Sequence, residues 1–396
     1  MSARPARPAP VLARPEHRLL LLCARTRADA EAGEEIRRLV AGGPDWDYLY
    51  RLARRHAVLP LIYRRLRAAA SNEMPPAQLR RLGDDFRANT ARALYLTAEL
   101  ERVVSLFEAE GVPVIPYKGP ALAAFAYGDL ALRRYVDLDI LVRKEDLPRA
   151  KGLLAARGFR PAWRLTPAQE RVLLRSQHNF PFEREEGRLV VELHWELAAP
   201  RYAAPRDETV WSRLVPVKLA GREVKCLGPE DLLLSLCVHG TKHLWERLAW
   251  ICDVAELLNS QPDLDWASVC ERARAAGTER MLLLGLRLAR GLLEAPLPDE
   301  IERLAEAEPS LGRLAETVTA RLFEGPGQGP PGLLSSISFN LLARRGLAER
   351  VRYFGFIFTP TDGDLAVLTL PRPLSFVYYL LRPFRLLLKG GPGQSE

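Results

Sequence analysis

Two carboxylates stand two residues apart in the segment 136–142, which reads Val-Asp-Leu-Asp-Ile-Leu-Val. The apolar and β-branched residues predict a strand, and on a strand Asp137 and Asp139 point to the same face. Neighbouring carboxylates repel each other unless a cation lies between them, and Mg²⁺ prefers oxygen ligands. The pair therefore indicates a divalent metal site, while a solvated edge strand is the alternative interpretation of the same pattern.

A third carboxylate, Glu192, lies in a second predicted strand over 190–196. Residues alternate along this strand, so that the polar side chains share one face and the apolar side chains share the other. The polar face holds Glu192, His194 and Glu196. If this strand pairs beside the first, Glu192 can join the metal site or accept the proton of an attacking hydroxyl. A polar sheet face near solvent is the alternative.

Lys118-Gly119 follows a predicted strand over 112–117 and precedes a predicted helix that begins with Pro120. Gly119 allows close approach to the backbone, Lys118 supplies a positive charge, and the start of a helix favours anions. The turn therefore suggests phosphate binding, although it lacks the spacing of a P-loop and also reads as a plain tight turn. Arg133 and Arg134 precede the Asp strand and suit phosphate through their planar guanidinium groups, with at least one of them expected at the surface.

These segments together resemble a known family. The stretches 117–122, 127–129 and 133–142 resemble the NTP-transferase-5 family of the DNA polymerase β-like nucleotidyltransferase superfamily. The strand at 192–195 resembles the family's acid-Leu-His-Trp pattern, and 55–60 resembles its N-terminal helical signature. The segment 239–253 resembles its His-rich helical signature, so that the resemblance extends over roughly 46–258.

The resemblance implies an α/β (α+β) core with a mixed sheet, flanked by helical subdomains. It also implies Mg²⁺ (or Mn²⁺) as cofactor and a nucleoside triphosphate, ATP among them, as donor substrate. Asp137, Asp139 and Glu192 become the metal ligands and catalytic carboxylates. The superfamily's usual Gly-Ser is replaced here by Lys118-Gly119, so the hydroxyl that contacts phosphate is absent.

The implied reaction moves a nucleoside monophosphate group to a hydroxyl, phosphate or protein side chain and releases pyrophosphate. The acceptor, a small molecule, peptide or protein, is not identified by the sequence. A catalytically inactive nucleotide-binding or scaffold protein with the same fold is the alternative function.

A separate cluster of basic residues lies on a predicted helix over 239–243. His239 and His243 are four residues apart and share one helix face. A buried structural pair and a role in orienting acceptor or phosphate are both compatible with this spacing. A zinc site lacks a third ligand, and Lys242 would disfavour a nearby cation. Asp253 is the expected partner that fixes one of the imidazoles, and His194 is grouped with these residues as a candidate acceptor or structural cluster.

The composition is that of a globular protein. The 396 residues carry a net charge of +8 and are 48% hydrophobic. The arginines are scattered over helical stretches, so no nucleic-acid partner is expected. The five cysteines include no C-x-x-C pair and no signal peptide is evident, which favours a reducing, cytoplasmic location.

The chain is expected to divide into five parts. These are a loose N-terminal tail (1–15), a helical N-terminal subdomain (16–90), the α/β core (91–200), a helical subdomain (201–324), and a linker with a C-terminal tail (325–396). Within the last part, 374–389 combines aromatic residues with three cations. That composition suggests weak peripheral contact with a membrane or a protein partner, with Pro383 expected to interrupt any helix there, while a plain packed terminal helix is the favoured alternative.

Overall fold

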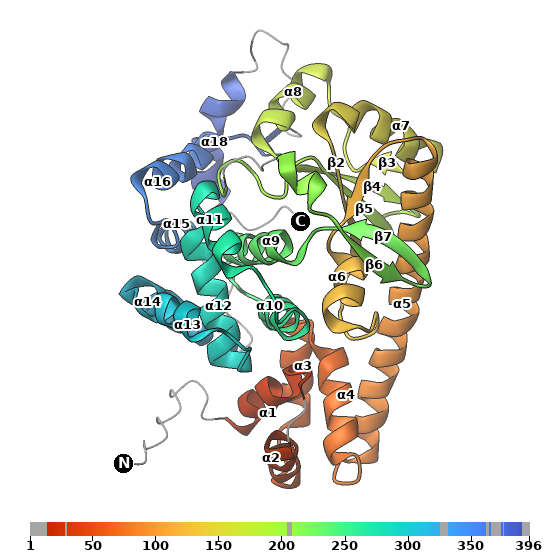
Figure 1. The fold of residues 1–396 in the computed structure, drawn as a ribbon, viewed down its shortest axis with the longest axis vertical. Helices are drawn as coiled ribbons and strands as arrows, with labels where there is room; N and C mark the ends of the chain where they lie inside the picture. The colour runs from red at the N-terminus through yellow and green to blue at the C-terminus, as the bar shows by residue number, and fades with distance from the viewer. Residues whose placement is uncertain are drawn as a thin grey trace.

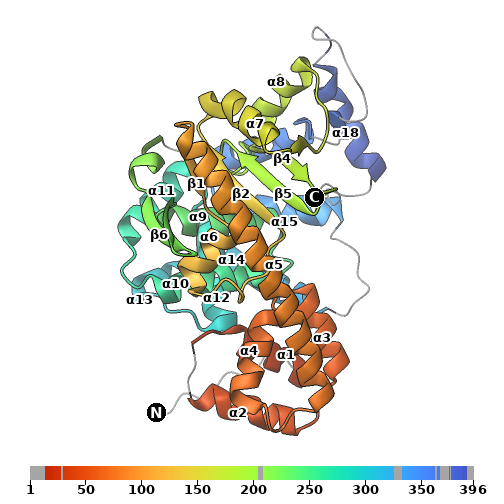
Figure 2. The same ribbon diagram turned by 90° about the vertical axis from the view of Figure 1, so that its right-hand side faces the viewer.

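The computed structural model describes residues 14–27, 30–203, 208–324, 332–361, 364–365, 374 and 376–389. Most of the expected N-terminal tail (1–13) and linker (325–331) lies outside the described residues. The described chain builds a helical N-terminal layer, a central sheet, and a helical layer that continues to the C-terminal region (Figures 1 and 2).

The N-terminal layer packs three short helices around a fourth, which in turn packs against the first half of one long helix. The first four are α1 (Pro15–Ala24), α2 (Ala30–Ala41), α3 (Trp46–Arg55) and α4 (Leu59–Ala70), and the fifth is α5 (Pro76–Ala109). Helix α5 runs unbroken for 34 residues. The proposed boundary between residues 90 and 91 therefore falls inside a helix whose two halves serve different cores.

The central sheet has five strands in the order β1-β2-β5-β4-β3. The strands are β1 (Val114–Pro116), β2 (Asp137–Val142), β3 (Arg160–Pro161), β4 (Asn179–Arg184) and β5 (Leu189–His194). β2 and β5 are parallel, and the other neighbouring pairs are antiparallel. The predicted mixed sheet is confirmed.

One face of the sheet is covered by α5 and by α7 (Leu147–Ala156), as Figure 2 shows. Leu138, Ile140, Val191 and Leu193 point into this core and are fully buried. Because side chains alternate along a strand, the polar residues between them point to the opposite face. That face looks towards the helical layer that follows the sheet in the chain.

The remaining elements follow in chain order, and most are helical. They are α6 (Gly119–Leu122), the π-helical turn η2 (Ala123–Tyr127), η3 (Lys144–Asp146), α8 (Pro167–Ser176), η4 (Glu208–Ser212), β6 (Val215–Leu219), β7 (Arg222–Cys226), α9 (Pro229–Lys242), α10 (Leu248–Ser260), α11 (Trp266–Ala276), α12 (Glu279–Leu293), α13 (Asp299–Glu306), α14 (Pro309–Phe323), α15 (Leu333–Leu342), α16 (Leu347–Phe354), η5 (Gly355–Ile357) and α18 (Val377–Lys389).

Two features differ from the sequence-based expectation. The chain after residue 200 begins with the β6–β7 hairpin, where only helices were expected. Pro383 lies inside α18 and does not interrupt it. Among the described helices, none has the length and apolar character needed to cross a bilayer.

Candidate active site

The acidic residues come together because β2 and β5 are parallel neighbours. In their register Asp139 lies directly opposite Glu192, and Asp137 lies opposite Val190. Paired residues of adjacent strands point to the same face, so both carboxylates leave the sheet on the side away from α5. The predicted juxtaposition of Glu192 with the two aspartates is therefore present.

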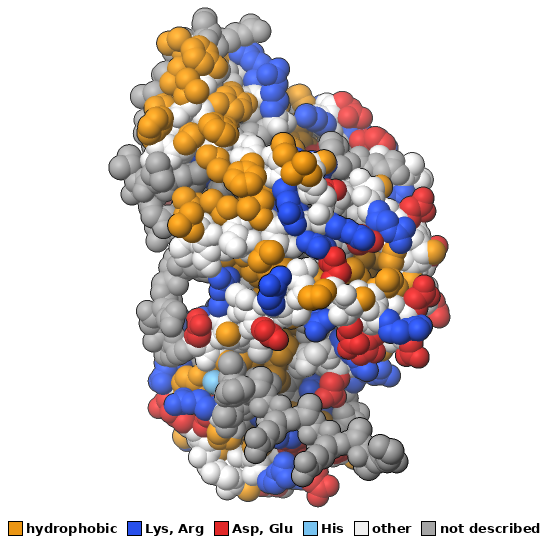
Figure 3. All heavy atoms as spheres, turned by 90° about the vertical axis from the view of Figure 1, so that its left-hand side faces the viewer, with side chains coloured by type: hydrophobic (Ala, Val, Ile, Leu, Met, Phe, Trp, Pro, Cys, Tyr) orange, Lys and Arg blue, Asp and Glu red, His pale blue; other side chains and the backbone are white. Residues whose placement is uncertain are grey.

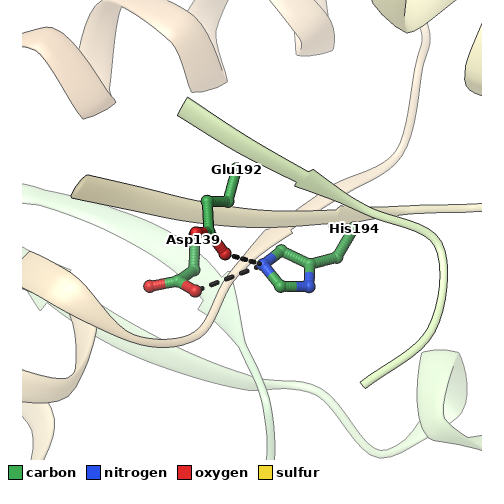
Figure 4. Close-up of side chains that lie close together, drawn as sticks. All are labelled: Asp139, Glu192 and His194. Carbon is green, nitrogen blue, oxygen red and sulfur yellow. Dashed lines mark ion pairs between the residues drawn. The ribbon is translucent and has the colours of Figure 1, made fainter. Parts of the chain in front are cut away.

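His194 completes this cluster, as Figure 4 shows. Its Nε2 atom lies 3.2 Å from Oδ1 of Asp139 and 3.1 Å from Oε2 of Glu192. On the other side of the ring, the Tyr117 hydroxyl lies 3.1 Å from Nδ1. The Asn179 amide donates a hydrogen bond of 2.7 Å to Oε2 of Glu192. We grouped His194 with the basic helix on sequence grounds, but the structure puts it among the carboxylates.

These groups fit a divalent cation. One ligand atom each from Asp139, Glu192 and His194 lies within 4.8 Å of the others, and this is the single such group of three within the described ranges. The Nε2 atom is buried, and neither carboxylate is aligned to accept a hydrogen bond from it. A buried polar atom without an aligned partner, facing two carboxylates, is a donor set that a metal ion would satisfy.

The carboxylates influence each other's ionisation. Burial, followed by the charges of Asp139 and Glu192, raises the pKa of Asp137 to about 7. Burial also opposes ionisation of Asp139, but the charge of Lys118 and the contact with His194 outweigh it and hold the pKa of Asp139 below its usual value. Negative charge is therefore crowded at this face, and a bound cation would relieve it.

Lys118 and Gly119 form the turn between β1 and α6, beside the carboxylates. The Lys118 ammonium donates to Oδ1 of Asp139 at 3.3 Å, and Nδ1 of His239 lies 3.5 Å from the same nitrogen. Gly119 has a φ of +53°, and a Cβ atom there would stand 3.2 Å from the carbonyl oxygen of Asp137. Helix α6 has only four residues, so its dipole adds little positive potential at this turn. The Lys118 ammonium is therefore the main positive charge there.

Arg133 is engaged with Asp253 on α10. Its guanidinium donates two hydrogen bonds, of 2.8 and 2.9 Å, to the two carboxylate oxygens. The Tyr127 hydroxyl donates a third, of 2.8 Å, to the same side chain. Asp253 thus pairs with an arginine and a tyrosine, and the expectation that it fixes an imidazole is wrong. Arg134 is exposed.

The basic segment 239–243, at the end of α9, contacts the site through His239. Burial, and then the charge of Lys118, hold the pKa of His239 well below its usual value, so the neutral ring accepts a hydrogen bond from Lys118. The rings of His239 and His243 are 4.6 Å apart, and both contact Trp250 on α10. Burial, and then the charge of Lys242, hold the pKa of the buried His178 well below its usual value.

Three contributors were not foreseen as site residues: Tyr117, Asn179 and Tyr127. Asn179 pairs with His194 in the antiparallel register of β4 and β5. The loop between β4 and β5 spans residues 185–188, and counting outwards from this loop places Asn179 opposite His194. Tyr117 adjoins Lys118, but it contacts His194, which is 77 residues away in the chain. No local sequence pattern predicts that contact.

Comparison with known proteins gives a family and a set of distant structures. The family model for an uncharacterised nucleotidyltransferase matches residues 42–294. No curated protein sequence matches the chain.

The solution structure of the antibiotic-resistance factor ANT(2'')-Ia is similar at 14% identity and a TM-score of 0.28, covering 56% of this chain and 95% of that one. An antigenic nucleotidyltransferase-like protein from Paracoccidioides brasiliensis is similar at 14% identity and a TM-score of 0.30, covering 56% of this chain and 92% of that one.

Proposed function

Because this chain belongs to the uncharacterised nucleotidyltransferase family, and is thus a transferase enzyme, we propose that it moves a nucleoside monophosphate group from a nucleoside triphosphate to an acceptor and releases pyrophosphate. A divalent cation, Mg²⁺ or Mn²⁺, is proposed as its cofactor, with Asp137, Asp139 and Glu192 as ligands. Asp139, Glu192 and His194 form the group whose ligand atoms lie within 4.8 Å of one another, and Asp137 lies outside that group.

The observation that carries this proposal is the register of β2 and β5. It sets Asp139 directly beside Glu192 and leaves the buried Nε2 of His194 facing both carboxylates. Rigid strands hold these groups, and their opposite faces are locked in the core by fully buried leucine and valine side chains. When bound, a divalent cation would supply charge stabilisation for the attacking and leaving oxygens of a phosphoryl displacement.

In the proposed reaction, the bond between the α-phosphorus and the oxygen of the leaving pyrophosphate breaks. A new bond forms between that phosphorus and an oxygen of the acceptor, and Glu192 receives the acceptor's proton. Asn179 orients Glu192 for this task through its hydrogen bond to Oε2. Lys118 supplies positive charge for the phosphates, and Gly119 lets them approach the backbone.

The two arginines are proposed to differ in role. Arg133 is bound bidentately to Asp253, so its proposed part is to hold the loop before β2 against α10. Arg134 is exposed and stays available to contact a phosphate. The five cysteines are free thiols, which is compatible with the proposed cytoplasmic location. ATP is one of the donors to be tested, and the proposed acceptor is a small molecule, peptide or protein.

The test is pyrophosphate release with each of the four nucleoside triphosphates, Mg²⁺ or Mn²⁺, and pooled acceptors. We expect Asp137→Asn and Asp139→Asn to abolish release, while Asp84→Asn, which alters an exposed carboxylate on α5, retains it. Full activity in the site variants would overturn the mechanism. Tight triphosphate binding by calorimetry without release from the wild type would favour a nucleotide-binding protein that has lost turnover.

A further inference from the structure

The C-terminal helices present a large apolar surface to solvent. Eleven of the fourteen exposed large hydrophobic side chains in the described part of the chain fall between residues 334 and 384. Figure 3 shows hydrophobic side chains gathered over this side of the molecule, with Lys and Arg side chains beside them. Isolated exposed apolar residues are ordinary, but a contiguous patch marks an interaction surface.

The patch is continuous across several elements. α15 packs against α16, and η5 contacts both α16 and α18. Leu347 on α16 is 78% exposed, Leu334 on α15 is 82% exposed, and Phe384 on α18 is 67% exposed. The surface therefore comes from a folded arrangement of helices and extends well beyond the 374–389 segment that the sequence singled out.

The two faces of α18 explain why its apolar side points outwards. The inner face is anchored by polar contacts: the Gln169 amide donates to the Tyr378 hydroxyl at 3.1 Å, and Arg382 pairs with Asp364 at 3.0 Å. The outer face carries Leu380, which is 56% exposed, and Phe384. The inner face also places Tyr378 in the hydrophobic core beside the sheet, so α18 is docked by a mixed face and leaves Leu380 and Phe384 exposed on the other.

The positive charge beside the apolar surface indicates which kind of partner binds there. On the described part of these elements, the exposed or partly exposed charged side chains are mostly cationic: Arg345, Arg350, Arg352 and Arg385 against Glu349. Arg344, Arg382 and Asp364 are buried. Anionic lipid headgroups attract such a surface while the acyl region receives the leucine and phenylalanine side chains. A symmetric contact with a second copy would bring the two basic surfaces together, which like-charge repulsion disfavours.

We propose that this apolar and basic surface, formed by α15, α16, η5 and α18, docks the protein on anionic membranes. The contact is peripheral, with leucine and phenylalanine side chains entering the interfacial region and arginines lying at the headgroups. It does not depend on the proposed nucleotidyl transfer, because no residue of the carboxylate site belongs to this surface.

The test is co-sedimentation of the full chain with phosphatidylglycerol–phosphatidylcholine vesicles and with pure phosphatidylcholine vesicles. Binding to the anionic vesicles should exceed binding to the neutral ones at least tenfold and weaken as salt is raised. The double variant Leu380→Ser/Phe384→Ser should lose at least tenfold in partitioning. The matched control, Leu94→Ser/Leu304→Ser, removes two exposed leucines from α5 and α13 and should bind as the wild type does.

Light scattering and thermal unfolding of the same variants complete the test. Equal melting temperatures would show that Leu380→Ser/Phe384→Ser keeps the fold. The proposal is overturned by absent vesicle binding, or by binding that the double variant leaves unchanged. A dimer in wild-type solution that this variant dissociates would also overturn it, because a second copy would then cover the surface.

Discussion

Gly119→Ala probes how tightly the turn before α6 must approach the Asp strand. Gly119 has a left-handed φ of +53°, and an added Cβ would stand 3.2 Å from the carbonyl oxygen of Asp137. Ordinary Cβ contacts to oxygen are longer, so the turn or the strand must move by a few tenths of an ångström. The residue that moves on the strand side is the first of the two proposed metal-binding aspartates.

Gly128→Ala is a matched control for this change. Gly128 has a φ of +65° and nothing within 4 Å of an added Cβ. Alanine at this position therefore has the free-energy cost of the left-handed backbone but makes no close contact. A left-handed conformation costs a non-glycine residue about 1–2 kcal/mol. Both variants should therefore lose about 1–2 kcal/mol of stability by urea denaturation, and Gly119→Ala should lose somewhat more because of the contact.

Activity should separate the two variants. Displacement of Asp137 misplaces a proposed metal ligand, and small misplacements at a reacting centre cost up to roughly 100-fold in rate. We expect kcat/KM for pyrophosphate release to fall at least about tenfold in Gly119→Ala and to stay within about twofold of wild type in Gly128→Ala. Equal activities in the two variants would refute the idea that close approach at Gly119 sets the position of Asp137.

Three further predictions concern buried polar groups. Arg133→Met should destabilise the protein by about 3–5 kcal/mol in urea unfolding, because it leaves the buried Asp253 carboxylate without its partner. The double variant Arg133→Met/Asp253→Leu should lose less stability than the two single losses added together. Strict additivity of the two losses would show that the pair is not coupled. His239→Leu removes the hydrogen-bond acceptor that holds Lys118 and should lower kcat/KM about tenfold. His239→Gln keeps an acceptor oxygen and should retain most activity. Equal losses of activity in the two variants would show that His239 acts by packing. Burial lowers the pKa of His56 to about 4 from 6.5. The unfolded chain thus binds its proton first, and stability due to neutral His56 is present above pH 6.5 and lost as the pH falls towards 4. The stability advantage of wild type over His56→Gln should shrink by about 2.5 kcal/mol between pH 7.5 and 4.5 in urea unfolding, and a constant difference would contradict the assignment.

The clustering of the carboxylates could be expected because its signals are local and periodic. Asp137 and Asp139 alternate with leucine and isoleucine, and Glu192 alternates with valine and leucine, so each strand and its polar face follow from short-range sequence. The four-residue hairpin loop at 185–188 sets the register of β4 and β5, which brings Asn179 opposite His194. Pairing of the two acidic strands was an expectation, and the sheet order confirms it.

Other features could not be predicted because they depend on contacts between distant segments. The β6–β7 hairpin is short, carries Pro216 in its first strand, and lies next to β1 in space, so its strand character depends on tertiary packing. Pro383 removes one helical hydrogen bond, but the polar contacts of α18 with Gln169 and Asp364 hold the helix together across it. The partner of Asp253 is 120 residues away, and no local pattern identifies it.

The same long-range contacts bear on whether the α/β core is an independent unit. Lys118 and Arg133 belong to the proposed core at 91–200, but their partners His239 and Asp253 belong to the helical part that follows. Asp253 is almost fully buried, and Arg133 is largely so. Cutting the chain at residue 200 would leave Arg133 without the carboxylate that pairs with it, and breaking a buried ion pair in this way costs several kcal/mol. Domains of this size have only about 5–15 kcal/mol of stability. The sheet supplies the acidic side of the site and the helices α9 and α10 fix its basic side, so we interpret the two parts as one functional unit.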